Sequence, residues 1–526
     1  MTSSLIFIIL FALVALVTKY GVEIYCIFAP KFGLVDKPDQ QRKIHKQAVP
    51  VGGGVVIFLM FVLFSLLASF FPLDVPTNVD VIRRIFLPVC IASLILVCVG
   101  LVDDRFGMKG KVKLAFQVLA ASILIACARE YSQIILFGYV FDLGHLFYPL
   151  GVIWLVGMIN AINLLDGADG VASTTGFCMT ITIACLASIN GHVGLFYIAI
   201  AFSGVIFGFF LCNRPPARVY LGDTGSMFIG FTVGILLLRV SVVGNRDIYV
   251  ISPLAVALIP ILDSVFAIVR RKNSGRGIFS PDRGHIHHRL LIKFGKNYET
   301  LGILILLILP GCIAAIAGTY FRNDWIPALT CIVVVVAAAI TGIFGREELK
   351  IIIHRVANRF RKRLQRDKYD QTGEVFHFQG NGPWELLWGD FIPALKRFHC
   401  VRAHLDINMP FLHEDYSSEW ENMELHNKSK FNLSCSVPLV CESQKVGMLN
   451  MTFDTCLISN VEALQIVTDM SDFCVKYIAD YINQKIQNGT ISRKYIEIKD
   501  VQKTEVSFLR FDSAFLRKNH VSDPTL

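Results

Sequence analysis

The chain has 526 residues, of which 54% are hydrophobic and only 17% are charged, and its formal net charge is +9. With a mean hydropathy of +0.55 and apolar residues in long runs, this composition excludes a soluble globular protein and predicts an all-α polytopic membrane protein. The 14 cysteines show no paired CxxC spacing, so neither a disulfide framework nor a zinc site is indicated.

About eleven apolar runs approach the 20 residues that cross a hydrocarbon core. They cover residues 4–27, 50–72, 85–102, 112–128, 146–165, 170–189, 193–212, 223–242, 249–271, 301–321 and 325–344. The first run has no basic residue before it and no small-residue cleavage site after it, which predicts a retained span rather than a signal peptide. We therefore expect about eleven transmembrane helices in residues 1–345.

Lys and Arg are distributed unevenly between the loops. The loops after odd-numbered runs hold about sixteen of them and those after even-numbered runs hold about five. Because basic residues favour the cytoplasmic side, we expect the N-terminus outside and the odd-numbered loops and the C-terminal region in the cytoplasm. A bacterial inner membrane is the first expectation for the location, with the endoplasmic reticulum as an alternative.

In this topology five polar clusters emerge on the cytoplasmic side, beginning with the basic loop from Lys37 to Lys46. The second is the pair Asp103-Asp104 at the end of the third run. Two adjacent carboxylates repel each other, and a bound cation, a nearby base or protonation would relieve the repulsion. Mg²⁺ prefers oxygen ligands and usually shares them with a substrate phosphate. A solvated pair at the membrane boundary is the alternative interpretation.

The third cluster lies at the cytoplasmic end of the fifth run. Asn160, Asn163 and Asp166 recur at i, i+3 and i+6, which places three polar groups along one helix face. Their burial near lipid costs free energy unless they meet partners, and hydrogen bonds between helices would suffice for the asparagines. Asp169, in the glycine-flanked turn that follows, is harder to explain in this way.

The fourth cluster is the turn Gly222-Asp223-Thr224-Gly225-Ser226 at the start of the eighth run. Its glycines allow close backbone approach, the helix start offers free N–H groups to an anion, and Asp223 could hold a bridging cation. An ordinary helix N-cap at Asp223 or Thr224 is the simpler interpretation of this turn taken alone.

The fifth cluster is His285-Ile286-His287-His288, which follows Arg283 in the longest predicted loop between spans. Without a cysteine or an HExxH pattern, it favours phosphate or sugar contacts over zinc. Asp263, inside the ninth run, is a further intramembrane acid, and pairing with Arg270 or Arg271 would explain it structurally.

In their order over residues 1–345, these motifs resemble the polyprenyl-phosphate N-acetylhexosamine-1-phosphate transferase family, glycosyltransferase family 4. The resemblance rests on Val-Asp-Asp-Arg-Phe-Gly, Asn-Xaa-Xaa-Asn-Xaa-Xaa-Asp-Gly-Xaa-Asp-Gly, Gly-Asp-Thr-Gly-Ser and His-Ile-His-His. It implies transfer of a sugar 1-phosphate from a UDP-sugar to a polyprenyl phosphate, such as undecaprenyl phosphate, at the cytoplasmic face with release of UMP. Whether transfer is direct or passes through a phospho-aspartate stays open.

The resemblance also implies roles for single residues. Mg²⁺, with Mn²⁺ as a substitute, would bind Asp223 with support from Asp103 and Asp104. The acids implied to be catalytic are Asp103, Asp104, Asp166 and Asp169. The residues implied to bind substrate are Lys43, His45, Lys113, Asn160, Asn163, Tyr220, Arg283, His285, His287 and His288. Tyr220 would stack on the uracil, and Lys43, His45 and Lys113 would contact the lipid phosphate, although as basic residues they could equally be positive-inside anchors.

The spaced His-Xaa-His-His pattern resembles the branch of the family that uses simple UDP-N-acetylhexosamines, so UDP-N-acetylglucosamine is the first expected donor. No nucleic-acid partner is expected, and a second copy of the chain, forming a homodimer, is a candidate partner. The competing function is a transporter of an anionic solute. Transporters tend to place polar groups near the bilayer midplane in broken helices, whereas these clusters gather at one face.

Residues beyond 345 have a different composition. A basic linker over 346–370 suits anionic membrane lipid or is a stop-transfer flank only. Residues 371–499 predict a small cytoplasmic α+β domain with strands near 433–440 and 446–453 and a helix near 460–485, faintly resembling the end of a GAF-type domain. A flexible tail is expected over 500–526.

Overall fold

The computed structural model describes residues 2–36, 48–70, 79–127, 133–243, 247–273, 284–342, 374–379, 383–409, 414–422, 432–441 and 444–487. The chain divides into two compact units. One holds residues 1–268 and 279–346, and the other holds residues 269–278 and 347–526. The linker predicted over 346–370 and the tail predicted over 500–526 lie outside the described residues.

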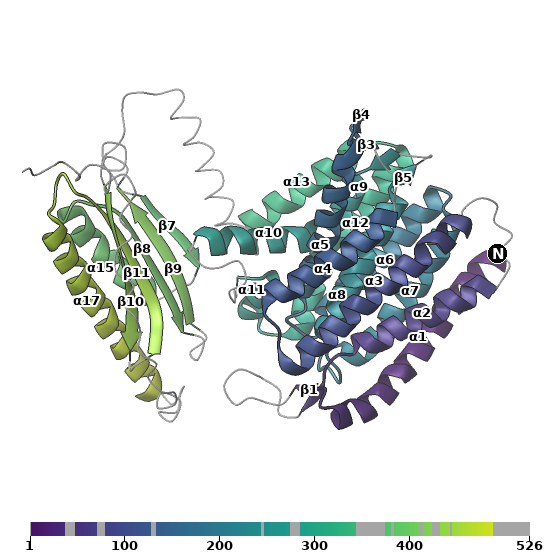
Figure 1. The fold of residues 1–526 in the computed structure, drawn as a ribbon, viewed down its shortest axis with the longest axis horizontal. Helices are drawn as coiled ribbons and strands as arrows, with labels where there is room; N and C mark the ends of the chain where they lie inside the picture. The colour runs from purple at the N-terminus through teal and green to yellow at the C-terminus, as the bar shows by residue number, and fades with distance from the viewer. Residues whose placement is uncertain are drawn as a thin grey trace, which may run out of the picture. The chain divides into compact units, whose positions relative to one another are not determined.

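The first unit is a bundle of long apolar helices (Figure 1). Eight helices of the described part of the chain are long and apolar enough to cross a membrane, and two more are apolar but shorter. These findings fit a multi-pass membrane protein, while the number of eleven spans stays a prediction. The bounds are α1 Thr2–Phe28, α2 Gly54–Phe70, α3 Val79–Phe106, α4 Gly110–Cys127, α5 Phe147–Leu165, α6 Val171–Ile189, α7 Val193–Asn213, α8 Gly222–Val240, α9 Ile251–Val256, α10 Leu258–Asn273, α11 Ile286–Phe294, α12 Asn297–Phe321 and α13 Trp325–Ile340, with 3₁₀ turns at Ala29–Phe32 and Gly144–Leu146.

The ninth predicted span, 249–271, is not one continuous helix. It is divided into α9 and α10, with a break at Ala257. Pro260 has no N–H to donate to the carbonyl of Val256, so one bond of the helical ladder is missing, although the N–H groups of Ala257 and Ile261 still bond the carbonyls of Pro253 and Ala257. The single-span prediction is therefore corrected to two helices.

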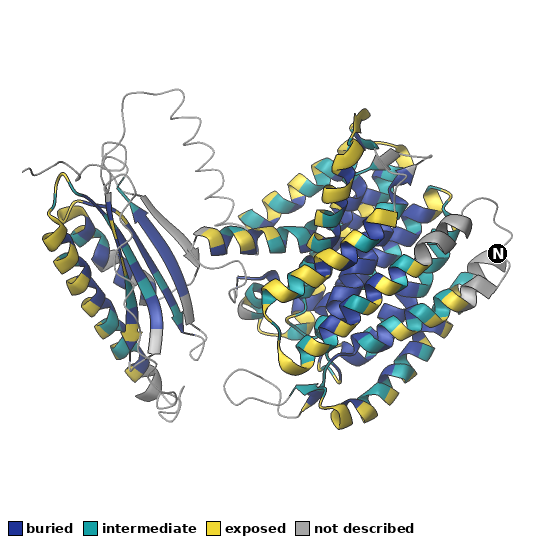
Figure 2. Cartoon of the chain, in the orientation of Figure 1, coloured by how far each residue is buried: buried dark blue, intermediate teal, exposed yellow. Residues whose placement is uncertain are grey.

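Helix α8 lies at the centre of the bundle and contacts α2, α3, α5, α6 and α7. Of the candidate spans in the described residues it is the most buried, which is visible as a dark blue core (Figure 2). Its first turn packs against two glycines on neighbouring helices. A Cβ added at Gly54 would lie 2.1 Å from the Cα of Gly225, and one at Gly100 would lie 2.4 Å from the Cα of Thr224. Small residues thus allow three backbones to meet where the Asp223 turn begins.

Short strands lie at opposite ends of the bundle (Figure 1). At one end, β1 (Val35–Asp36) pairs with β2 (Val49–Pro50). At the other, β3 (Gln133–Leu136), β4 (Tyr139–Asp142), β5 (Val242–Val243) and β6 (Asp247–Tyr249) form a sheet in the order β4-β3-β6-β5. This sheet joins the loops after the fourth and eighth predicted spans, as expected if both loops emerge on the same side.

The second unit contains a five-stranded antiparallel sheet in the order β10-β11-β8-β9-β7. Its elements are β7 Glu374–Gln379, α15 Pro383–Arg397, β8 Cys400–Met409, β9 Glu414–Glu421, β10 Asn432–Cys441, β11 Gln444–Asp454 and α17 Asn460–Gln487. The predicted strands near 433–440 and 446–453 and the predicted helix near 460–485 are confirmed as β10, β11 and α17. The likeness to a GAF-type domain stays a prediction.

The helices α15 and α17 of the second unit contribute to a hydrophobic core of its own. Trp384 and Trp388 of α15 are buried there with Trp420 of β9 and apolar residues of α17. The start of α17 is fixed by a capping box, in which the Ser459 hydroxyl accepts a hydrogen bond from the backbone N–H of Glu462 at 3.2 Å and the Glu462 carboxylate accepts one from the N–H of Ser459 at 3.0 Å. The second unit therefore has the features of an independent domain.

Candidate active site

The centre of the site is an ammonium group between two carboxylates. Asp103 lies in the last turn of α3, Lys113 in the first turn of α4 and Asp223 in the first turn of α8. Lys113 Nζ lies 2.6 Å from Asp103 Oδ2 and also contacts Asp223 Oδ2. All three side chains are largely shielded from solvent, with exposed fractions of 13%, 18% and 26% for Asp103, Lys113 and Asp223. Three helices thus bring one positive and two negative charges into direct contact.

Asp104, the neighbour of Asp103, points to a different partner. Its Oδ1 accepts a hydrogen bond from the backbone N–H of Asp223 at 2.8 Å. Its Oδ2 accepts two more, from the N–H of Thr224 at 3.2 Å and from the Thr224 hydroxyl at 2.6 Å. The carboxylate therefore caps the N-terminus of α8 from a different helix.

The two asparagines of α5 also differ in their contacts. Asn163 Nδ2 donates to Asp223 Oδ1 at 2.7 Å and to Ser226 Oγ at 2.9 Å, so it orients the Asp223 carboxylate. Asn160 Nδ2 donates to Gln117 Oε1 at 2.7 Å and thereby joins α5 to α4. Asn163 belongs to the carboxylate cluster, whereas Asn160 makes the helix–helix contact that the sequence offered as an alternative.

Asp166 and Asp169 lie at the turn between α5 and α6. Asp169 Oδ2 accepts a hydrogen bond from the backbone N–H of Ala217 at 3.1 Å, which anchors the loop that leads to Tyr220 and Asp223. The carboxylate of Asp166 accepts no hydrogen bond within the described residues. Burial, followed by the nearby carboxylates of Asp223, Asp104 and Asp169, raises the pKa of Asp166 well above its ordinary value. Asp166 is therefore an acid for which a cation or a proton is still needed.

The histidine cluster reaches the same end of the bundle. His285 Nδ1 lies 2.9 Å from Asp263 Oδ2, and Asp263 Oδ1 accepts the backbone N–H of Ile286 at 2.9 Å. This buried acid in α10 holds the start of α11. His287 packs against the turn after Asp166, since a Cβ at Gly167 would lie 2.1 Å from its Nε2.

Three imidazoles lie next to one another at this point. The rings of His285 and His287 are parallel with centroids 5.9 Å apart, and the ring of His288 lies 4.2 Å from that of His287. Burial and the two neighbouring histidines lower the pKa of His287 well below its ordinary value, so it is neutral at pH 7. Neither of its ring nitrogens has a hydrogen-bond partner among the described residues.

The backbone of Tyr220 is bonded to the connection between α1 and α2. Its N–H donates to the carbonyl of Pro50 at 2.8 Å, and its carbonyl accepts the N–H of Gly53 at 3.1 Å. Burial, with a smaller contribution from Asp169 and Asp36, raises the pKa of Tyr220 to about 12, so the phenol stays protonated at neutral pH. The Pro-Val-Gly-Gly segment thus fixes the backbone of the residue predicted to stack on a base.

The oxygen donors of this cluster suit a hard divalent cation only if the cation takes few of its ligands from the protein. Within the part of the chain that the structure describes, no three His, Cys, Asp or Glu side chains are arranged to hold a metal ion together. The cluster already contains a cation, Lys113, between Asp103 and Asp223, and the donors around it are oxygens. Mg²⁺ usually takes one or two carboxylates and fills its remaining positions with water and substrate phosphate, so Asp223 and Asp103 are sufficient.

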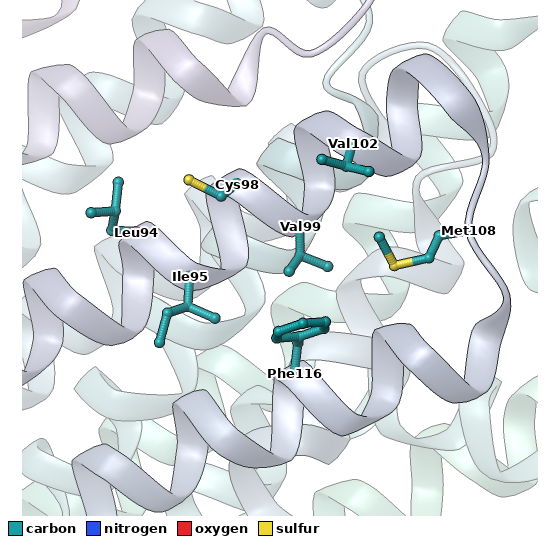
Figure 3. A pocket seen from close by; sticks show the side chains of 7 residues that line it. All are labelled: Leu94, Ile95, Cys98, Val99, Val102, Met108 and Phe116. Carbon is teal, nitrogen blue, oxygen red and sulfur yellow. The ribbon is translucent and has the colours of Figure 1, made fainter.

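An open apolar groove of about 450 Å³ runs between α3 and α4 (Figure 3). It is lined by Leu94, Ile95, Cys98, Val99, Val102, Met108 and Phe116. Val102 immediately precedes Asp103, and Phe116 follows Lys113 by three residues, about one helical turn. Apolar surface therefore begins directly beside the charged cluster.

Four of the five polar clusters predicted to share one side are thus brought together, by α3, α4, α5, α8 and α11. The structure does not describe Lys43, His45 or Arg283, which lie outside the described residues, so their roles stay predictions. Sequence reasoning did not identify the contacts of Gln117 and Ser226 or the partner of Asp263. A polar residue in an apolar helix was the available signal for Gln117 and Asp263, but it does not specify the partner.

Comparison with known proteins agrees with this geometry. Residues 86–241 match the model of a family described as glycosyl transferase family 4. The chain is 30% identical to the probable undecaprenyl-phosphate N-acetylglucosaminyl 1-phosphate transferase of Bacillus subtilis, over 61% of this chain and 87% of that protein. It is 31% identical to the decaprenyl-phosphate N-acetylglucosaminephosphotransferase of Mycolicibacterium smegmatis, over 62% of this chain and 85% of that protein.

A third relative is the undecaprenyl-phosphate alpha-N-acetylglucosaminyl 1-phosphate transferase of Thermotoga maritima, which is 32% identical over 55% of this chain and 84% of its own length. The chain therefore covers most of each relative, and about two fifths of the chain lies outside the alignment with the Bacillus protein. With this similarity and with its motifs assembled in one site, the chain belongs to glycosyl transferase family 4.

Proposed function

We propose that the protein transfers N-acetylglucosamine 1-phosphate from UDP-N-acetylglucosamine to a polyprenyl phosphate, with undecaprenyl phosphate as the first expected acceptor, and releases UMP. The observation that carries this proposal is the meeting of four separate motifs at one end of the bundle, where Asp104 and Asn163 contact Asp223 and His287 packs against Gly167. The names of the relatives, which contain both the N-acetylglucosaminyl phosphate group and a polyprenyl phosphate, support the choice of substrates.

The chemistry requires neutralisation of charge before it requires a base. An oxygen of the acceptor phosphate forms a bond to the β-phosphorus of the donor, the bond from that phosphorus to the oxygen bridging the two phosphates breaks, and UMP leaves with that oxygen. A phosphate monoester is already largely ionised at neutral pH, so it gains little from proton removal. The ammonium group of Lys113 is suited to attract the phosphates, whereas the N–H groups of Asp223 and Thr224 at the start of α8 already donate to Asp104.

Mg²⁺ is the cofactor that we propose for this site. The residues that would hold it are Asp223 and Asp103, and Asn163 orients the first of them. When bound, the ion would neutralise phosphate charge and polarise the phosphorus–oxygen bonds. Two groups remain to contact the diphosphate or the sugar. They are the carboxylate of Asp166 and the ring nitrogens of His287, none of which has a hydrogen-bond partner within the described residues.

The acceptor also needs apolar surface for its isoprenoid chain. The groove between α3 and α4 provides such a surface beside Asp103 and Lys113. In the proposed orientation, which follows from the distribution of Lys and Arg between loops, this end of the bundle faces the cytoplasm of a cell with a bacterial-type inner membrane. The polar groups gather at one end of the bundle, which favours a transferase over a transporter.

The test is UMP release by the detergent-purified full-length protein with undecaprenyl phosphate, Mg²⁺ and a panel of UDP-sugars. We expect release that depends on the lipid, is strongest with UDP-N-acetylglucosamine, and is abolished by a chelator and by Asp223→Asn. A folded protein that releases no UMP with any donor of the panel would contradict the proposal. Release with a different sugar would keep the reaction and change the donor.

A further inference from the structure

The two adjacent acids of α3 have separate surroundings, although the sequence suggests a single acidic pair. Asp103 faces the Lys113 ammonium at 2.6 Å. Asp104 faces the first turn of α8, where it accepts three hydrogen bonds, two from backbone N–H groups and one from a hydroxyl. A carboxylate has about four acceptor positions, so most of those of Asp104 are already occupied.

The backbone around Asp104 is shaped to admit its carboxylate. Gly222 has a φ of +70°, and a Cβ at this position would lie 2.5 Å from Asp104 Oδ2. On the other side, Gly100 lets α3 approach so closely that a Cβ there would lie 2.4 Å from the Cα of Thr224. A side chain at either glycine would push the carboxylate away from the helix end. The site is therefore built to bring this acid to the N–H groups of Asp223 and Thr224.

These hydrogen bonds act on the residue that carries the proposed metal. The first N–H groups of a helix have no partner within the helix, and an oxygen acceptor that meets them fixes the position of the first turn. Because one of the three donors is the N–H of Asp223 itself, Asp104 sets the backbone from which the Asp223 carboxylate projects. A displacement of that carboxylate by about 1 Å is enough to cost about 100-fold in rate.

We propose that Asp104 is a positioning residue, which caps α8 and holds Asp223 in place, and that Asp103 is the acid of the pair that faces the cation. The assignment rests on the proposed function for its kinetic consequences only. In this role Asp104 is needed because its oxygens accept hydrogen bonds, and its negative charge is not required.

Substitution of Asp104 by asparagine distinguishes a positioning residue from a metal ligand or general base. With its amide oxygen at the position of Oδ1, Asn can accept from the N–H of Asp223, and its NH₂ at the position of Oδ2 can donate to the Thr224 hydroxyl. Only the longer bond from the N–H of Thr224 is lost, so Asp104→Asn keeps two of the three contacts of the cap. We expect Asp104→Asn to lower kcat by about tenfold or less and Asp104→Ala to lower it by about 100-fold, with KM for the donor unchanged in both. For a metal ligand or general base, Asn would be as damaging as Ala, with a loss of about 10²–10⁴-fold.

The experiment compares Asp104→Asn and Asp104→Ala with Asp103→Asn and Asp103→Ala in the full-length protein. Alongside kcat and KM, the Mn²⁺ affinity is measured by electron paramagnetic resonance and the melting temperature is measured without metal. We expect Asp104→Asn to bind Mn²⁺ as the unmodified protein does, and Asp103→Asn to bind it more weakly. We expect the metal-free melting temperature to fall in Asp104→Ala and to be largely restored in Asp104→Asn.

Thr224→Val provides an independent check, because it removes one of the three donors with almost no change of shape. If Asp104 acts through the cap, Asp104→Ala and Thr224→Val together will cost less in melting temperature than the sum of the two single changes. Weakened Mn²⁺ binding in Asp104→Asn, with activity as low as that of Asp104→Ala, would overturn the assignment. Since metal binding and melting require no substrate, they test Asp104 even if the unmodified protein releases no UMP.

Discussion

The side chains of the site form two groups. One group has hydrogen-bond partners within the protein, and the other has none among the described residues. Asp104, Asp169 and Asn163 accept or donate hydrogen bonds that fix backbones and carboxylates. Asp166 and His287 have no such partner among the described residues. Buried polar groups without partners are costly, so a protein retains them where a ligand completes them. This distinction separates the positioning residues from those expected to touch substrate.

Lys113 is the cation that balances Asp103 and Asp223. Substituting it with Met leaves two largely buried carboxylates without a counter-charge, which should reduce the free energy of unfolding by about 3 kcal/mol in the absence of metal. We expect Mg²⁺ to raise the melting temperature of Lys113→Met more than that of the unmodified protein, because the ion replaces the lost charge. Transfer activity should fall strongly, since the phosphates also lose a cation.

Thermal melting with and without Mg²⁺ checks this expectation, and Lys111→Met, at an exposed position two residues earlier, is the matched control. Equal stabilisation of both variants by Mg²⁺ would show that Lys113 and the ion do not share a site.

His287 predicts how stability depends on pH. Burial lowers its pKa in the folded protein well below the ordinary value of 6.5. Below pH 6.5 the unfolded chain therefore binds a proton that the folded protein does not bind, and the free energy of unfolding falls as the pH falls. At pH 5.5 this single group should cost on the order of 1 kcal/mol relative to neutral pH.

We expect the melting temperature to fall less between pH 7.5 and 5.5 in His287→Asn than in the unmodified protein. His145→Asn, at an exposed position, provides the control for the substitution of a histidine as such. Parallel curves for His287→Asn and the unmodified protein would mean that His287 takes up a proton in the folded state.

At the scale of the helices, the sequence predicts where along the chain each helix lies better than it predicts the residues at which a helix begins and ends. The apolar runs locate α1 to α8, α12 and α13, because each run is an uninterrupted apolar stretch of membrane length. Hydropathy does not reveal the break at Ala257, near which Pro260 lacks the N–H that would bond the carbonyl of Val256. Nor does it reveal the extension of α3 through Asp103 and Asp104 to Phe106. The motifs identified the clusters that meet, but the separate partners of Asp103 and Asp104 depend on side-chain direction, which sequence spacing does not give.

Close packing of α3 on α8 predicts a cost for any side chain at Gly100. In Gly100→Ala the new methyl group would meet the backbone of Thr224, and the two helices would have to separate. We expect a loss of about 1–3 kcal/mol in the free energy of unfolding, as for other overpacked cores. Activity should fall as well, because the same movement withdraws Asp104 from the end of α8.

Gly157 in α5 is the matched control, since a Cβ there would meet no atom within 4 Å. Gly157→Ala should be neutral or slightly stabilising, because Ala has the higher helix propensity. An equal loss of melting temperature in both variants would contradict the α3–α8 explanation, because Gly157→Ala adds no close contact and helix propensity favours Ala at both positions.

At the scale of the whole molecule, the two units are separate in construction. Every described side chain of the site belongs to the first unit, which includes α2 to α8 and α11. The second unit has its own sheet, its own capped helix and a hydrophobic core closed by Trp384, Trp388 and Trp420. These relatives are aligned over 55 to 62% of this chain, so about two fifths of it lies outside each alignment.

Termination of the chain after residue 345 should therefore leave a protein that still catalyses transfer with an unchanged KM for the UDP-sugar, because none of the described groups that would bind the donor or the metal is removed. The measurement is UMP release by the shortened protein, with its melting temperature as the test of folding and removal of residues 500–526 alone as the control. A change in kcat without a change in KM would identify the second unit as a regulator of turnover. Complete loss of transfer in a shortened protein that melts cooperatively would show that the second unit takes part in catalysis, because the first unit would then be folded and still inactive.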